Sequence, residues 1–238
     1  MKVIPVTGVS GSGKTTFIRS LIPLLARFGP VGTVKHTGHH SMLLPKGKDT
    51  TVMFEAGAVA VAGIDQEKTL VTLRSTSLTD ALDFLAGQGI AVAVIEGYKG
   101  SSLPKIIIGD LEAERCVLRD PEPEEVIPVL DRFPDYHSPG ELLRELGVEC
   151  REEGGECVMA FSTVPLPRGT ADPGPSLPGI ARAVEGLAGV IGVEAAYRQG
   201  SLFGGTDEVI IAVAARNGEA AVEALGAALS RLRESGGF

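Results

Sequence analysis

Tryptophan is absent from the 238-residue sequence, and aromatic residues account for only 5% of it, whereas 31 residues are glycine. The scarcity of large rings and the abundance of small residues favour helices packed closely on a sheet over a β-sandwich. The sequence also lacks an apolar run long enough for a signal peptide or a membrane span. We therefore expect a cytoplasmic protein without a membrane partner.

Basic residues are outnumbered, since 22 lysines and arginines stand against 30 aspartates and glutamates and give a net charge of −8. Proteins that bind nucleic acids concentrate positive charge in order to neutralise phosphates. We therefore expect no nucleic-acid partner. Any anion that the chain binds must be held by a local arrangement of residues.

Cysteine is also scarce, and the three residues Cys116, Cys150 and Cys157 form no CxxC pair. This pattern argues against a zinc site or a disulfide framework. Cys150 and Cys157 flank a charged stretch that contains glycine. Two alternatives stay open for them, a disulfide in an oxidising or hyperthermophilic setting or two inert free thiols.

One nine-residue stretch carries the strongest functional signal, because its first eight residues match G-x-x-x-x-G-K-[ST] in every position between an apolar run and a helical pattern. The stretch consists of Gly8, Val9, Ser10, Gly11, Ser12, Gly13, Lys14, Thr15 and Thr16. The glycines let backbone amides turn toward an anion, and the helix N-terminus adds the positive end of its dipole. Lys14 is expected to reach the β- and γ-phosphates of a nucleotide, and Thr15 to ligate Mg²⁺. The alternative is a glycine-rich turn that only caps a helix.

The order of apolar patterns predicts an α/β fold with a mainly parallel sheet, followed by a small α+β domain. Strand, helix and strand over residues 3–34 form a βαβ unit, whose strands run parallel. Capping boxes at Ser77 and Ser138 mark the starts of two later helices, the second ending at Leu146. Further strands are expected at 58–62, 69–73, 90–95, 104–108, 158–164, 193–197 and 209–214, and further helices at 52–56, 180–187 and after Asn217.

The domain boundary is expected within residues 148–156, which are charged and glycine-rich and show no apolar face. This division gives a nucleotide-binding domain at 1–150 and a smaller α+β domain at 156–238. The second part contains no second phosphate-binding loop and no repeat.

Glu96 ends the predicted strand at 90–95, where P-loop folds place the acid that holds magnesium or its water. A solvated acid at a strand end is the alternative. Tyr98 and Lys99 follow directly, and we expect them to lie over the same crevice at the carboxyl edge of the sheet.

Lys35 and His36 open a polar loop at the end of the second strand, so they face this crevice too. Three histidines, His36, His39 and His40, lie within five residues. Three alternatives stay open for them: contact with the phosphates or a substrate, a plain loop, or a transition-metal site. No helical i, i+4 spacing supports a closed metal site. Further along, Asp49 is another crevice candidate, and the charged stretch 46–49 either adds positive charge there or forms a solvated turn.

With these residues in view, positions 1–150 resemble the MobB family of P-loop proteins in molybdopterin-guanine dinucleotide synthesis. The resemblance rests on residues 8–16 (GVSGSGKTT), 34–36, 47–49, 56–58, 96–99 and 104–106. It implies binding of GTP with Mg²⁺, slow hydrolysis, a homodimer, molybdopterin as a possible ligand, and a MobA-like guanylyltransferase as partner. Val52 and Ile107 depart from the family pattern, which usually has arginine and an acid there. The sequence contains no Asn/Thr-Lys-x-Asp guanine-reading stretch, so spacing leaves GTP and ATP open.

Residues 156–238 resemble MoaE, the large subunit of molybdopterin synthase, through the stretches 158–164, 197–202 and 207–214. Tyr197 stands where that family has histidine, and the chain ends before the lysine-bearing tail that carries the family's catalysis. The resemblance therefore implies a domain that has lost sulfur insertion and serves as a binding or dimerisation module.

The leading hypothesis is an accessory GTP-binding protein, at most a weak GTPase, in the maturation of a molybdenum or tungsten cofactor. Slow turnover agrees with the lack of an obvious arginine finger in the loops. A small-molecule kinase is an alternative, with His36 or Asp49 as its general base. A non-catalytic scaffold is another.

Overall fold

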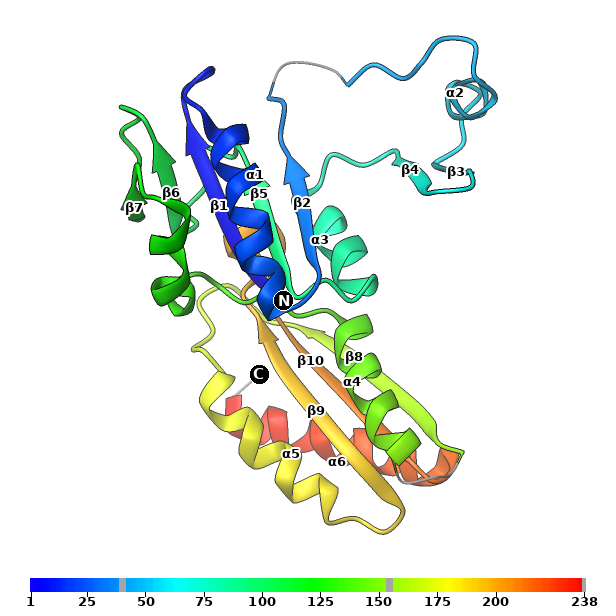
Figure 1. Cartoon of the computed structure of the whole chain (residues 1–238). Helices are drawn as coiled ribbons and strands as arrows, with labels where there is room; N and C mark the ends of the chain where they lie inside the picture. The colour runs from blue at the N-terminus through cyan, green and yellow to red at the C-terminus, as the bar shows by residue number, and fades with distance from the viewer. Residues whose placement is uncertain (39–41, 153–155, 237–238) are drawn as a thin grey trace.

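The protein is described here from a computed structural model that covers residues 1–38, 42–152 and 156–236. It is an α/β fold with a five-stranded parallel sheet, a three-stranded antiparallel sheet and a separate two-stranded hairpin (Figure 1). These features confirm the predicted fold class. Among the described residues, no helix is both long and apolar enough to cross a membrane.

The parallel sheet has the order β2-β5-β1-β6-β7. Its strands are β1 (Lys2–Gly8), β2 (Val31–Lys35), β5 (Val92–Glu96), β6 (Lys105–Ile108) and β7 (Cys116–Arg119). The central strand β1 is buried on both faces, as its continuous apolar run requires. Helix α1 (Lys14–Leu25) and the 3-10 segment η2 (Pro123–Arg132) cover one face, and α3 (Leu78–Gly87) covers the other.

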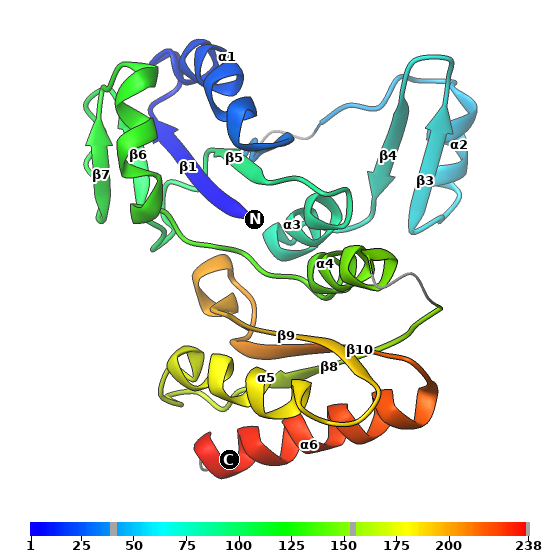
Figure 2. The same ribbon diagram turned by 60° about the horizontal axis from the view of Figure 1, so that its bottom comes forward.

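The two-stranded hairpin stands apart from the parallel sheet. Strands β3 (Ala60–Ile64) and β4 (Thr69–Leu73) form it, and helix α2 (Asp49–Glu55) precedes it. All three project to one side in both views (Figures 1 and 2). Several large apolar side chains on it are exposed, among them Ile64 and Leu70. Residues 49–73 are called the hairpin arm below.

The second sheet has the order β8-β10-β9, with β8 (Val158–Pro165), β9 (Val190–Arg198) and β10 (Glu208–Ala215). Helices α5 (Leu177–Glu185) and α6 (Gly218–Gly236) pack on one face, and α4 (Pro139–Glu152) packs on the other (Figure 2). The middle strand β10 is therefore buried along almost its whole length. This three-layer unit from α4 to α6 is called the C-terminal module.

The boundary region differs from the prediction. Helix α4 does not end at Leu146 but continues to Glu152, through the stretch expected to lack an apolar face. Leu142, Leu146 and Cys150 form one apolar stripe at four-residue spacing, and this stripe packs on β10. The high charge of the other positions hid the stripe. The packing unit therefore changes before α4, while residues 153–155 lie outside the described part.

The two predicted capping boxes are only half formed. The Oγ atoms of Ser77 and Ser138 accept hydrogen bonds from the amides three residues later, at 3.3 and 3.2 Å. The return bonds are replaced, because Asp80 instead accepts from Ser75 and Glu141 pairs with the N-terminal ammonium of Met1. The helices nonetheless begin where the sequence predicts.

Cys150 and Cys157 form a disulfide between the end of α4 and the start of β8, with a Cα–Cα distance of 6.1 Å. Of the two alternatives that the sequence leaves open, the structure has the bonded one. The remaining cysteine, Cys116, is exposed and free.

Replacing Cys150 and Cys157 together by serine is expected to lower the free energy of unfolding by about 2 kcal/mol. Both proteins are compared without reductant, so that the wild type keeps its disulfide. The disulfide closes a short loop, and the loss reflects the extra entropy of the unfolded chain. Urea unfolding followed by circular dichroism measures it. Cys116→Ser is the matched control and should change nothing, and a dithiothreitol-insensitive wild type would contradict the role of the disulfide.

Arg198 connects the C-terminal module to the parallel sheet with its covering elements α1, α3 and η2, which together are called the first unit below. Its side chain is 8% exposed, and Nη1 donates to Asp83 Oδ1 of α3 at 2.8 Å and to the Tyr136 hydroxyl at 3.0 Å. The same guanidinium pairs with Glu208 of β10. Burial, followed by the charge of Asp83, raises the pKa of Tyr136, so its hydroxyl stays protonated. Phe203 adds an apolar contact, because it packs into the core around α3 with its ring edge-on to Tyr136.

Candidate functional site

The loop between β1 and α1 has the backbone form that an anion cradle needs. Gly11 and Gly13 have φ angles of 77° and 91°, a left-handed conformation that glycine adopts without strain. A Cβ at Gly8 would lie 2.2 Å from the carbonyl oxygen of Ile108, so only glycine fits there. The amide of Phe17 bonds to the carbonyl of Gly13, which leaves the amides of residues 14–16 without an intrahelical acceptor.

Lys14 folds back over this loop, where its Nζ donates to the carbonyl of Val9 at 2.6 Å. Burial lowers its pKa, Glu96 acts in the opposite direction, and Lys99 and Lys35 lower it further. Lys14 is thus within electrostatic reach of two further ammonium groups and one carboxylate, in a chain of net negative charge. Such a local surplus of positive charge favours an anionic ligand.

Glu96 and Thr15 supply oxygens of the kind that magnesium prefers. The Thr15 hydroxyl donates to Glu96 Oε2 at 3.2 Å, and the other carboxylate oxygen lies 3.1 Å from Lys35 Nζ. Glu96 ends β5, next to β1 in the sheet, so the sheet itself sets this proximity. The donor set fits a magnesium ion at the mouth of the cradle.

The segment after β5 is held in a strained but supported form. Tyr98 has a φ of 50°, and its ring stacks on His36 with centroids 4.3 Å apart. A Cβ at Gly97 would lie 2.9 Å from the His36 carbonyl oxygen, so the two segments can approach only because this residue is glycine. Burial raises the pKa of Tyr98. Non-glycine residues with such left-handed backbone angles occur preferentially at functional sites.

Lys105 stabilises the segment that follows β5 through hydrogen bonds to its backbone. Although it lies on β6, its side chain is almost fully buried, and Nζ donates to the carbonyls of Ser101 and Lys99 at 2.5 and 3.4 Å. Burial lowers its pKa, and the charge of Glu114 opposes that shift. The buried ammonium fixes the loop that carries Tyr98 and Lys99.

These segments enclose a cleft of about 1010 Å³. Eight of the predicted site residues line it. They are Gly8, Ser10, Lys14, Lys35, His36, Glu96, Tyr98 and Lys99. The remaining loop residues lie on the same loop and first helical turn, and they are Val9, Gly11, Ser12, Gly13, Thr15 and Thr16.

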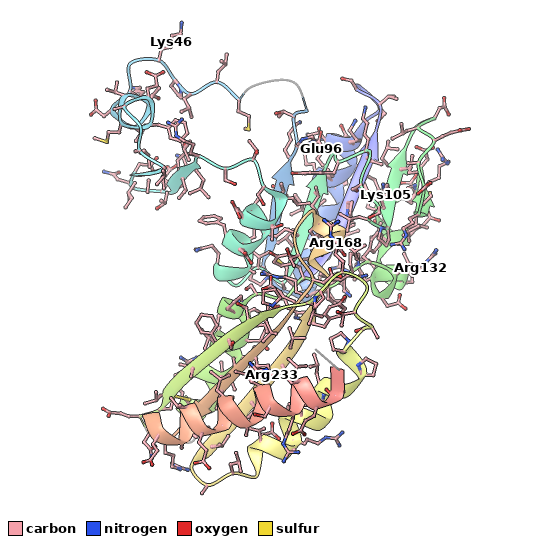
Figure 3. All side chains as sticks on the ribbon, turned by 180° about the vertical axis from the view of Figure 1, so that it is seen from behind. Lys46, Glu96, Lys105, Arg132, Arg168 and Arg233 are labelled. Carbon is pink, nitrogen blue, oxygen red and sulfur yellow. A yellow bond between two sulfur atoms is a disulfide. The ribbon has the colours of Figure 1, made fainter. Side chains whose placement is uncertain are left out.

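Asp49 does not join them, because it begins α2 in the hairpin arm. Figure 3 shows Lys46 near this arm, far from Glu96 and Lys105. The chain runs outward after β2, so closeness in sequence does not return residues 46–49 to the crevice. The charged stretch is therefore an exposed segment, and of the two general bases expected for a kinase only His36 lies in the cleft.

The metal interpretation of the histidine loop finds no support in the described part of the chain, where no group of three or more His, Cys, Asp or Glu residues could hold a metal ion. Two of its three histidines, His39 and His40, lie outside the described residues. His36 has the stacked contact with Tyr98 given above.

Sequence reasoning missed several residues of the cleft. Leu78, Ser101 and Ser102 line it from the first unit, and residues 201–204 line it from the C-terminal module. No local pattern marks them, because they reach the cleft through tertiary packing. In the sequence, the stretch 197–202 is marked only by its resemblance to MoaE.

The sequence model of molybdopterin guanine dinucleotide synthesis protein B matches residues 3–130, which is more than half of the chain. The chain belongs to the MobB family. The matched range contains the parallel sheet except for Lys2, the first residue of β1, and it contains every predicted site residue.

Two curated relatives agree with this assignment. The MobB chain is 34% identical over 138 residues to a molybdopterin-guanine dinucleotide biosynthesis adapter protein of Haemophilus influenzae, covering 56% of this chain and 75% of that protein. It is 35% identical over 106 residues to the adapter protein of Escherichia coli, covering 42% of this chain and 60% of that one. The structure of Bacillus subtilis MobB matches with 23% identity and a TM-score of 0.44, covering 56% of this chain and 99% of that one.

Proposed function

We propose that this MobB chain is an adapter in molybdopterin-guanine dinucleotide biosynthesis that binds GTP with Mg²⁺ in its phosphate loop. The observation that carries the proposal is the convergence of Lys14, Thr15 and Glu96 at the mouth of a glycine-rich cradle. Both curated relatives are named as adapter proteins of this biosynthesis, which supports the adapter role. GTP is preferred over ATP because the dinucleotide that the pathway makes contains guanine, as the relatives' names state.

The chemistry of the site follows from its residues. The amides of the loop and the Lys14 ammonium would bind the β- and γ-phosphates, and Thr15 and Glu96 would hold magnesium. Magnesium supplies charge neutralisation of the phosphates. Lys35, by pairing with Glu96, keeps that carboxylate directed to the cleft.

Hydrolysis is proposed to be slow. Among the described residues that line the cleft there is no arginine, so no bidentate cation stabilises the charge that develops on a transferred phosphoryl group. An arginine finger contributes about 10³-fold or more to turnover in P-loop enzymes. The protein is accordingly at most a weak GTPase.

The partners follow from the pathway. We infer that the protein is cytoplasmic, forms a homodimer and assists a MobA-like guanylyltransferase, which attaches GMP to molybdopterin, a second possible ligand. The metal of the mature cofactor is molybdenum or tungsten.

Calorimetry with GTP and ATP, combined with phosphate release with and without molybdopterin, tests this function. Tight GTP binding with negligible turnover supports the adapter. Fast ADP formation that depends on a small substrate would instead identify a kinase, and a lack of affinity for any nucleotide would leave a scaffold.

For the C-terminal module we propose a MoaE-like origin without sulfur-insertion activity. Tyr197, where MoaE has histidine, hydrogen-bonds Asp207 at 3.2 Å, and burial together with the charges of Asp207 and Asp172 raises its pKa to about 12. It therefore stays neutral near pH 7. Mixing the protein with a thiocarboxylated small subunit and precursor Z is expected to yield no molybdopterin, and formation of molybdopterin would refute the proposal.

Glu96→Gln is expected to abolish most of the gain in GTP affinity that magnesium provides, a loss of about tenfold, because the amide keeps the shape but not the charge that holds the ion. Calorimetric titrations with magnesium and with EDTA measure the gain. Glu67→Gln on the hairpin arm is the control and should behave as the wild type. An unchanged magnesium dependence in Glu96→Gln would remove Glu96 from the metal site.

A further inference from the structure

The cleft has one wall that the family match does not include. Residues 201–204 lie in the turn between β9 and β10 of the C-terminal module, beyond the matched range 3–130, yet they line the cleft together with residues of the phosphate loop. Part of this turn is the 3-10 segment η4 (Gly200–Phe203). The cleft is therefore lined in part by residues outside the range that the family model matches.

This turn is held firmly from both units. Phe203 is only 4% exposed in the core of the first unit, and its carbonyl accepts from Thr79 Oγ1 of α3 at 3.5 Å. Within the turn, the Ser201 amide donates to Asp207 Oδ1 at 2.7 Å. A Cβ at Gly200 would meet the carbonyl oxygen of Thr206 at 2.0 Å, which shows how closely the turn is packed. The wall is thus formed in advance, as binding sites for small molecules generally are.

The wall lies on the metal side of the phosphate loop. In the strand order β2-β5-β1-β6-β7, Lys35 and Glu96 end the two strands on one side of β1, and the cleft is lined by the segments that follow them. A nucleotide in the loop directs its β- and γ-phosphates to the lysine and the metal. The terminal phosphate therefore faces the cleft, and the nucleoside lies at the other end of the phosphate chain.

The cleft is too large for a terminal phosphate alone. Its volume of about 1010 Å³ is at the upper end of pockets for small molecules. Lys35 and Lys99 bring positive charge, and the stacked rings of His36 and Tyr98 offer a flat surface. Leu202 adds an apolar contact from the turn. This combination suits an anion that carries a flat heteroaromatic ring.

We propose that the turn at 201–204 forms one wall of a second subsite, which binds an anionic heteroaromatic ligand next to the terminal phosphate of the nucleotide. The proposal rests on the proposed nucleotide site and assigns the C-terminal module a direct part in ligand binding. Both ligands occupy one cleft, and the two units of the chain must stay in contact for the second subsite to exist.

Gly204 provides a matched pair of variants for the test. Its φ of 82° is a conformation that Asn and Asp tolerate best among non-glycine residues, and a Cβ there meets no atom within 4 Å. Gly204→Asp places a negative charge on the wall, and Gly204→Asn has the same shape without the charge. Any strain is shared by the two variants, so their difference reports the charge alone.

The probe is pterin-6-carboxylate, a fluorescent anion with a flat heteroaromatic ring, titrated into the full-length protein with magnesium and a non-hydrolysable GTP analogue. Gly204→Asp is expected to weaken probe binding at least about fivefold relative to Gly204→Asn, because like charges repel at short distance. The affinity for the GTP analogue should differ between the variants by less than about twofold, since screening weakens repulsion at the more distant loop.

The outcomes separate the two proposals. Equal probe affinities in the two variants, or no probe binding by a wild type that binds the nucleotide, would overturn the second subsite and leave the phosphate loop standing. If the nucleotide fails to bind, the proposed function fails. In that case the same probe titration without nucleotide tests the second subsite. Weaker probe binding by Gly204→Asp than by Gly204→Asn supports the subsite, and equal or absent binding overturns it.

Discussion

Lys14→Ala is expected to reduce the affinity for GTP with Mg²⁺ by about 100-fold or more, because it removes charge-assisted hydrogen bonds to two phosphates. Among the described residues, the hydrogen bonds of the ammonium go to the loop itself, at Val9 and Ser12. It also repels Lys35 and Lys99. The free energy of unfolding should therefore change by less than about 1 kcal/mol. Calorimetry and a urea titration measure the two quantities.

Lys46→Ala is the control for this prediction. Lys46 is exposed and precedes the hairpin arm, away from the cleft (Figure 3). Its substitution therefore removes the same charge from the chain without changing the site. Affinity within about twofold of wild type is expected for it. Wild-type affinity in Lys14→Ala would show that the nucleotide binds elsewhere.

Arg198→Met is expected to lower the free energy of unfolding by about 3 kcal/mol. Methionine keeps much of the length of the side chain, but the carboxylate of Glu208, which is 16% exposed, is left without its cation. The bonds to Asp83 and Tyr136 that connect the two units are lost as well. Urea unfolding at pH 7 measures the loss.

Two further variants isolate the cause. Arg168→Met removes an exposed arginine of the same module and should change the stability by less than about 0.5 kcal/mol. Adding Glu208→Gln to Arg198→Met removes the uncompensated charge and should recover about half of the loss. If Arg198→Met costs no more than Arg168→Met, the guanidinium does not hold the units together.

The parallel sheet could be predicted because its strands carry strong local signals. The apolar runs at 3–6 and 90–95 correspond to β1 and β5, and the predicted strand at 104–108 corresponds to β6. β7 and η2 escaped prediction for physical reasons. Residues 116–119 form a short edge strand with exposed positions, and η2 contains Pro128 and a kink at Val129, so it has no regular helical period.

The site divides in the same way. The phosphate loop follows from a local motif, and Glu96 could be placed because the ends of neighbouring parallel strands meet at one edge. Ser201 and Gly204 could not be placed, since nothing within their own segment relates them to a loop at residues 8–15. Their position depends on how Phe203 and Arg198 dock one unit on the other. The prediction for Asp49 was wrong for a related reason. Asp49 is close in sequence to the crevice residues, but the chain leaves the crevice before it reaches Asp49.

A crystal structure of the protein with magnesium and a non-hydrolysable GTP analogue tests the central claim most directly. We expect phosphate density within the loop of residues 8–15, in contact with the Lys14 ammonium, and an ion between Thr15 and Glu96. Nucleotide density elsewhere on the molecule, with this loop empty, would contradict it.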